Sequence, residues 1–232
     1  MIKKKAFDII GQMKRLLFIV LVFPAMLLHA QNITTASVFF SGVSAVYAKM
    51  SDYSASIKIT QGGTTSVGTV KFKSPEMLRM DFSIPAEQTI VFTGSELVVY
   101  VPSNRTLLSQ TVDDGGATTS NIPSSSGLML MQRSYTIAYE TGAEPIDLEE
   151  GSSEKVIALI LNRRNANETF RKMRLLISPE TLLIRRIEAW PISGNKITFD
   201  FTDYKVNAGI PDTAFIYTPP AGEIINNFLY TE

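Results

Sequence analysis

Charged side chains that could do chemistry stand close together in two short segments of this chain. Arg79 and Asp81 alternate with apolar residues, so both would lie on one face of a strand. They could orient a charged ligand group, although alternating charges on a strand usually form a solvated surface. Asp113-Asp114-Gly115-Gly116 combines carboxylates with glycines but lacks the spaced oxygen ligands of a calcium loop. We interpret this segment as a turn and predict no metal site.

The chain offers few other catalytic groups. It contains no Cys, and its single His is His29, which lies in a segment that we expect to be removed from the mature protein. The usual zinc ligand sets, histidine acid–base catalysis and thiol nucleophiles are therefore excluded for the mature chain. We predict that the protein is not an enzyme and that it needs no cofactor.

The first 30 residues have the composition of a signal peptide. Basic residues at 3–5, 14 and 15 precede an apolar run from Leu16 to Leu28, and Ala30 offers a small residue at a cleavage site. The apolar run is shorter than the roughly 20 residues that a membrane-spanning helix needs. We predict a cleaved signal peptide at 1–30, one mature domain at 31–232 and a periplasmic location. An uncleaved anchor, or a start at Met13, is the alternative.

The predicted mature chain is slightly acidic. Residues 31–232 contain 17 Lys and Arg and 21 Asp and Glu, which gives a net charge of −4. Such a surface has no basic excess to attract polyanions. We therefore expect no binding to nucleic acid or to anionic lipid headgroups.

Hydrophobic periodicity predicts one helix followed by a long series of strands. Residues 33–50 carry apolar side chains at helical spacing. The period then changes to two, and six strands with short turns are expected between residues 53 and 111. Further strands are expected at 135–139, 155–161, 170–177, 182–190 and 196–206, with Thr213–Tyr217 ending the sheet. The total is about eleven strands.

A polar segment interrupts the strands. Residues 112–127 are rich in Gly, Ser, Thr, Asp and Asn and are expected to form a loop. The apolar run Leu128–Met131 follows; it is too short for a full helix and would form either a lid tip or an interior plug. A long meander with one apolar face has to curl or be covered. The fold class is therefore mainly β (α+β), an unclosed, strongly curved antiparallel half-barrel with helices over its concave apolar face.

Two segments carry a family resemblance. Residues 75–102 place an Arg-Met-Asp-Phe strand, a Gln-Thr-Ile-Val strand and the strand Leu-Val-Val-Tyr-Val-Pro in order, and residues 215–222 read Phe-Ile-Tyr-Thr-Pro-Pro-Ala-Gly. This order resembles the LolA-like family, the periplasmic carriers of outer-membrane lipoproteins, whose chains end in Phe-x-Phe-Thr-Pro-Pro-x-Gly. The resemblance implies an unclosed β-barrel whose concave face takes up lipoprotein acyl chains.

The resemblance also implies a ligand cavity and partners. Alternation in the matched strands, together with the run at 128–131, predicts as lining residues Leu78, Met80, Phe82, Ile90, Phe92, Val99, Leu128, Met129 and Met131. The implied partners are outer-membrane lipoproteins, an inner-membrane lipoprotein-releasing complex and an outer-membrane acceptor, with the carrier acting as a monomer. The alternative function is an envelope module that senses lipids or lipoproteins without carrying them.

The chain departs from the family pattern near the lid. Ser74 stands where typical members have an Arg that holds the helical lid closed, and Val98 stands where an aromatic residue is usual. Arg79 is the candidate that could replace the missing latch. The resemblance therefore predicts a weaker lid closure unless another group takes over this role.

Overall fold

The computed structural model describes residues 34–111, 123–218, 220 and 222–227. The predicted signal peptide and most of the predicted polar loop lie outside these residues. The described chain opens with helix α2 (Ala36–Ala48), where a helix was predicted, and the Thr35 side chain caps it by accepting a hydrogen bond from the Val38 amide at 3.3 Å. Neither α2 nor any other helix in the described ranges is long and apolar enough to span a membrane.

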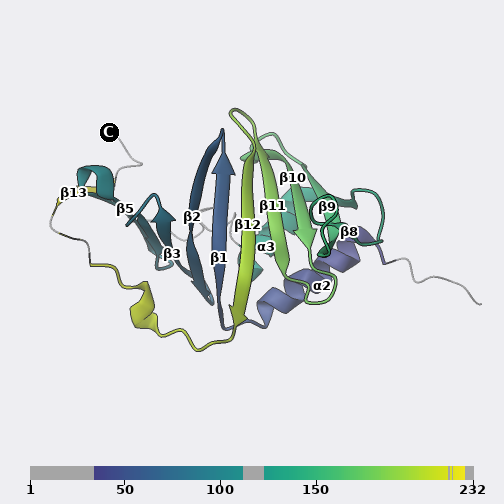
Figure 1. The fold of residues 1–232 in the computed structure, drawn as a ribbon, viewed down its shortest axis with the longest axis horizontal. Helices are drawn as coiled ribbons and strands as arrows, with labels where there is room; N and C mark the ends of the chain where they lie inside the picture. Colours follow the sequence, from purple (N-terminus) through teal and green to yellow (C-terminus); the bar gives the residue numbers. More distant parts are fainter. Residues whose placement is uncertain (1–33, 112–122, 219, 221, 228–232) are drawn as a thin grey trace, which may run out of the picture. The chain divides into compact units, whose positions relative to one another are not determined.

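Thirteen strands make up the sheet, and twelve of them form one continuous path (Figure 1). Their bounds are β1 (Asp52–Gln61), β2 (Thr64–Lys73), β3 (Met77–Ile84), β4 (Thr89–Phe92), β5 (Glu96–Val101), β6 (Thr106–Thr111), β7 (Tyr135–Tyr139), β8 (Ile146–Asp147), β9 (Lys155–Arg163), β10 (Phe170–Ile177), β11 (Ile184–Pro191), β12 (Ile197–Val206) and β13 (Glu223–Asn226). The spatial order is β13-β6-β5-β4-β3-β2-β1-β12-β11-β10-β9-β7, with β8 beside β9. The predicted unclosed, mainly antiparallel sheet is confirmed, and only the β13–β6 pair, among the described strands, is parallel.

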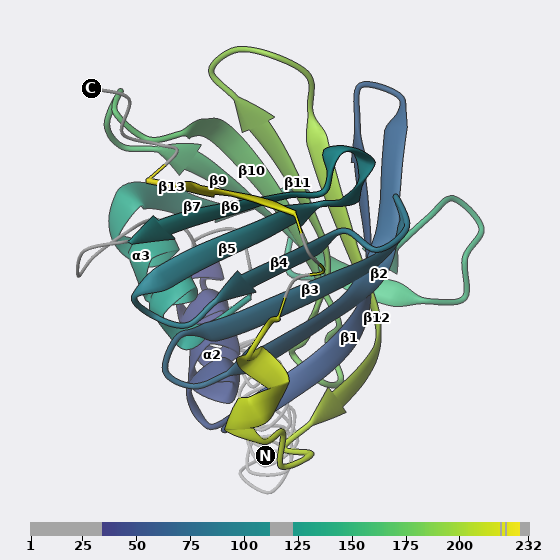
Figure 2. The same cartoon turned by 90° about the vertical axis from the view of Figure 1, so that its left-hand side faces the viewer.

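The sheet consists of two hairpin series joined at one seam. Strands β1 to β6 are consecutive neighbours, as are β9 to β12, and the seam is the long antiparallel pairing of β1 with β12. Gly68 lies at an irregularity where β2 meets β3, and a Cβ there would stand 2.2 Å from the Asp81 carbonyl oxygen. Only glycine permits this close approach of the two backbones, which helps β3 to β6 turn away from β1 (Figure 2).

One face of the sheet packs against the helices; we call it the inner face and the opposite one the outer face. The main core lies between the inner face and the helices. It joins Phe40, Val43 and Tyr47 of α2 to inner-face residues of nine strands, including Tyr53 of β1 and Phe201 of β12. The alternation predicted for the strands is what supplies this face, since every second residue points to it.

Two segments differ from the predictions. Leu128–Met131 belongs to a ten-residue helix, α3 (Ser125–Ser134), because the polar residues before it provide the first turn and Ser124 caps it by accepting a hydrogen bond from the Gly127 amide at 3.0 Å. Thr213–Tyr217 was predicted to end the sheet, and this was wrong: residues Asp212–Phe215 form a 3-10 turn, η4. The short strands β8 and β13 were not predicted.

The C-terminal segment crosses the outer face of β3 to β5 before β13 joins the edge of β6 (Figure 2). The Phe215 side chain is 2 % exposed, whereas its neighbour Ile216 is 65 % exposed. The Tyr217 ring lies 5.9 Å from the ring of Tyr100 on β5. Phe215 and Tyr217 therefore hold the segment on the sheet.

We expect Phe215→Ala to lower the free energy of unfolding by about 3–5 kcal/mol, because it removes a fully buried aromatic side chain. Urea denaturation measures the loss. Ile216→Ala is the matched control and should change stability by less than about 0.5 kcal/mol, as is usual at exposed sites. Equal losses in the two variants would contradict the assigned burial.

Candidate functional site

A row of apolar side chains crosses the inner face of β3 to β6. Met80 pairs with Ile90, Ile90 with Val99, and Val99 with Leu108. Cross-strand partners project from the same face of a sheet. All four side chains are half-buried, whereas Val70, which continues the row on β2, is fully buried. We call Met80, Ile90, Val99 and Leu108 the open inner row.

The helices explain why this row is half-buried. The core that includes α2 and α3 takes in inner-face residues of β1, β2, β7 and β9 to β12. On the β3–β6 side, its buried members among the described residues are only Leu78 and Phe92. Apolar surface left in contact with water costs roughly 25 cal/mol per Å². The open inner row is therefore a surface that an apolar ligand could cover with a gain in free energy.

The structure distributes the nine predicted lining residues over three environments. Met80, Ile90 and Val99 are half-buried in the open inner row. Five others are buried: Leu78, Phe82, Phe92, Leu128 and Met131. The Met129 side chain is 59 % exposed and stands apart from the others. Leu108 was missed, although the alternation of β6 could have identified it.

A buried hydrogen bond connects the start of α3 to the sheet. The Tyr53 hydroxyl, on β1, donates to the Pro123 carbonyl oxygen at 2.7 Å, directly before the Ser124 cap. Burial raises the pKa of Tyr53 well above 10, so the hydroxyl keeps its proton and remains a donor. Sequence reasoning did not identify Tyr53, because its period-two position predicts only a core residue.

Two other tyrosines, Tyr47 of α2 and Tyr204 of β12, contact the backbone of one β11 residue. The Ile184 amide donates to the Tyr47 hydroxyl at 3.1 Å, and the Tyr204 hydroxyl donates to the Ile184 carbonyl oxygen at 2.9 Å. Burial raises the pKa of Tyr47 to about 12. Tyrosine hydroxyls thus satisfy backbone groups where both helices meet the sheet.

Arg79 has contacts that differ from the predicted lid latch. Its Nε atom lies 2.9 Å from both carboxylate oxygens of Asp81, and Nη1 donates to the carbonyl oxygens of Ala214 at 3.1 Å and Ile216 at 3.2 Å. Since Arg79 alternates with the inner-face residues Leu78 and Met80, it lies on the outer face. It holds the C-terminal segment there, while Ser74 is exposed.

An open apolar row on an unclosed, helix-covered sheet agrees with the family comparison. The family model described as outer membrane lipoprotein carrier protein LolA matches residues 58–218, which is more than half of the chain. The chain belongs to the LolA family. An outer-membrane lipoprotein carrier protein of Legionella pneumophila (strain Lens) is 23 % identical over 190 residues, which cover 82 % of this chain and 88 % of the relative.

Solved structures are similar to this chain at low sequence identity. An uncharacterized conserved protein of Thermus thermophilus aligns with a TM-score of 0.54 at 12 % identity, covering 80 % of this chain and 98 % of the other. Lipoprotein LppX of Mycobacterium tuberculosis aligns with a TM-score of 0.49 at 9 % identity, over 76 % of this chain and 97 % of the other. At these identities the likeness concerns the fold alone.

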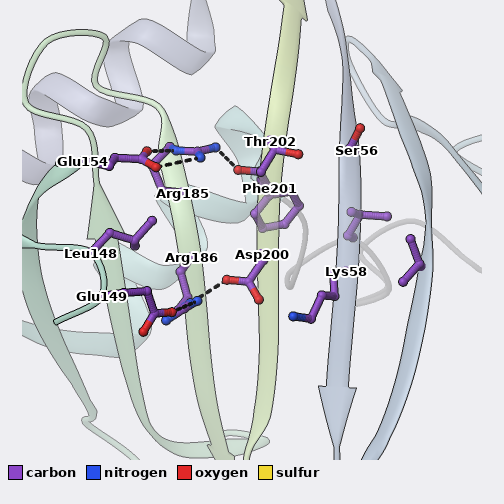
Figure 3. A pocket seen from close by; sticks show the side chains of 12 residues that line it. Ser56, Lys58, Leu148, Glu149, Glu154, Arg185, Arg186, Asp200, Phe201 and Thr202 are labelled. Carbon is purple, nitrogen blue, oxygen red and sulfur yellow. Dashed lines mark hydrogen bonds and ion pairs between the residues drawn. The ribbon is translucent and has the colours of Figure 1, made fainter. Parts of the chain in front are cut away.

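The outer face of this LolA-family chain has a hollow of about 370 Å³, lined by both charged and apolar side chains (Figure 3). It lies between strands β1, β11 and β12 and residues 148–154. Two consecutive arginines reach it because an irregularity in the β10–β11 pairing makes Arg185 the extra residue. Arg185 forms an ion pair with Glu154. Arg186 forms ion pairs with Asp200 and Glu149, both at 2.5 Å.

These ion pairs place charged groups in the lining of the hollow. The Arg185 guanidinium holds the pKa of the Glu154 carboxyl below its usual value, which keeps the pair charged. The pairs connect residues 149 and 154 to the sheet, so their role is to hold that loop in place. No group of three or more Asp, Glu, His or Cys side chains in the described ranges is arranged to bind a metal ion.

We expect Tyr53→Phe to lower stability by about 1–3 kcal/mol, because the buried Pro123 carbonyl loses its partner. It should also speed amide hydrogen exchange in α3, which measures opening of that helix. Tyr47→Phe is the matched control: it removes the buried hydrogen bond that joins α2 to the Ile184 amide, so stability should fall while exchange in α3 stays unchanged. Equal exchange in α3 for both variants would show that Tyr53 does not fix this helix.

Proposed function

We propose that this chain is a periplasmic carrier that binds the acyl chains of lipoproteins on its inner face and moves them from the inner to the outer membrane. The observation that supports this most directly is the open inner row, an apolar surface left half-exposed in a member of the LolA family. In this proposal residues 1–30 are a cleaved signal peptide, a releasing complex loads the carrier, and an outer-membrane acceptor unloads it.

Hydrophobic burial alone would provide the required affinity. Each buried methylene contributes ~0.8 kcal/mol, so ten methylenes contribute about 8 kcal/mol, which corresponds to micromolar binding before the costs of association. No catalytic group is needed for such a transfer, and we propose none.

Uptake would begin at the open inner row and continue beneath α3. Leu128 and Met131 of α3 pack into the core in the described state. If α3 moves outward, those two side chains, together with Leu78 and Phe92, would line the widened cavity. Methionine suits this role because its unbranched, polarizable side chain adapts to irregular apolar partners.

We expect Ile90→Asp to weaken the binding of a fluorescent fatty acid by at least about tenfold, because an unpaired carboxylate in an apolar site costs several kcal/mol. Val98→Asp is the matched control. Val98 is also half-buried and lies on the adjacent strand, but its side chain points to the outer face, so binding should stay within about twofold.

Loss of binding in both variants, or in neither, would contradict uptake on the inner face. Transfer needs a second measurement, in which the purified protein releases a lipoprotein from inner-membrane vesicles into solution and Ile90→Asp does not. Probe binding without any release would contradict the carrier function and leave only lipid binding.

A further inference from the structure

Basic side chains gather at one end of the sheet. They come from the last turn of α3, the end of β9, the start of β10 and the residue before β12; the set is Arg133, Arg163, Arg164, Arg171, Lys172 and Lys196. The strand register brings these positions to the same end, since Tyr135 pairs with Arg163 and Asn162 pairs with Lys172. We call these six residues the basic end.

The charge of the basic end is largely uncompensated. Within the described residues, only Lys196 of the six forms an ion pair, with Glu188 at 2.6 Å. Arg163 and Arg164 donate to the carbonyl oxygens of Ala166 and Tyr135, which leaves their charge in place. With Glu168 and Glu188 included, this end has a net charge of +4, while the remaining 11 basic and 19 acidic residues of 31–232 give −8.

An aromatic side chain lies among these cations. Trp190 is half-buried at the end of β11, and its ring centroid is 5.0 Å from the Lys172 Nζ atom and 5.6 Å from the Lys196 Nζ atom. Two residues further, in the β11–β12 hairpin, Ile192 is 59 % exposed. Tryptophan with flanking cations and an exposed aliphatic residue is the composition found where proteins meet the membrane interface.

We propose that the basic end docks on the surface of anionic phospholipid membranes, with Trp190 and Ile192 entering the headgroup region. The cations belong to four separate segments, which suits a surface of many laterally mobile phosphates. The net charge of −4, from which no attraction to anionic headgroups is expected, is an average over this asymmetry. The proposal goes beyond acyl-chain binding and does not depend on it.

Docking would also contact the helix that covers the inner face. Arg133 is in the last turn of α3, so a phosphate bound there would touch the segment whose start is held by Tyr53. The membrane surface and the apolar core would then act on the same ten-residue helix.

Tryptophan fluorescence tests the proposal directly, since Trp190 is the only Trp of the chain. The protein is titrated with vesicles of phosphatidylcholine containing phosphatidylglycerol, and with vesicles of phosphatidylcholine alone. We expect a blue shift and quenching by brominated lipid with the anionic vesicles only, and weaker binding as the salt concentration rises. Unchanged emission, or equal binding to both vesicles, would overturn the proposal.

The variant for this test is Arg133→Glu/Arg171→Glu/Lys172→Glu. It reverses three charged side chains that form no hydrogen bond or ion pair with described residues. Its partitioning onto anionic vesicles should fall at least about tenfold. The matched control, Lys49→Glu/Lys58→Glu/Lys205→Glu, makes the same change in net charge at exposed positions away from the basic end and should bind within about threefold of the unaltered chain. Equal losses in both would mean that net charge, and not this surface, controls binding.

Ile90→Asp separates docking from acyl-chain uptake. It should bind anionic vesicles normally while losing the fatty-acid probe, and the charge-reversed variant should bind the probe normally. If Ile90→Asp lost vesicle binding, membrane association would occur through the inner face and the basic end would not be the docking surface.

Discussion

The structure depends on one constraint: the sheet is unclosed, and the two helices among the described residues, α2 and α3, cover only part of its apolar inner face. Alternation along every strand creates this inner face, and the open edges at β13 and β7 prevent the barrel closure that would bury it completely. Helices α2 and α3 cover the face around the β1–β12 seam. The part that they leave half-exposed, on β3 to β6, is the same part on which an apolar ligand would rest.

Polar contacts hold the helices, the C-terminal segment and the loop at residues 149–154 on the sheet. Tyr47, Tyr53 and Tyr204 place a ring in the core and a hydroxyl on a backbone group, so each joins packing to hydrogen bonding. On the outer face, Arg79 holds the C-terminal segment and the paired arginines of β11 hold residues 149 and 154. The charged groups therefore serve the architecture on one side of the sheet, and the other side remains apolar.

Local patterns predicted much of the fold. The helix at 36–48 and eleven of the strands follow from hydrophobic periodicity, because each forms within one stretch of chain. Helix α3 was missed because its apolar run has only four residues and the polar residues before it, including the Ser124 cap, were assigned to a loop. The β13 strand was missed because parallel pairing with β6 depends on a crossing of the outer face, which no local pattern indicates.

The candidate sites divide in the same way. Met80, Ile90 and Val99 were predicted from alternation, which determines the face of a residue but not how far the helices cover it. Met129 was predicted beside them and is exposed, since a run of apolar residues does not reveal the orientation of a helix. The Tyr53–Pro123 hydrogen bond and the basic end join residues far apart in the chain, so only the register of the assembled sheet brings them together.

The seam between the first and the twelfth strands has a consequence for the order of assembly. Within each hairpin series, neighbouring strands follow one another in the chain, so their contacts are local and form quickly. The seam joins residue 53 to residue 206 and requires closure of a long loop. During synthesis, which proceeds from the N-terminus, the inner face of the first six strands therefore stays uncovered by its partners until the twelfth strand has emerged. Over that interval the apolar side chains of this face are exposed to water and to other chains, and apolar surface exposed in this way favours aggregation.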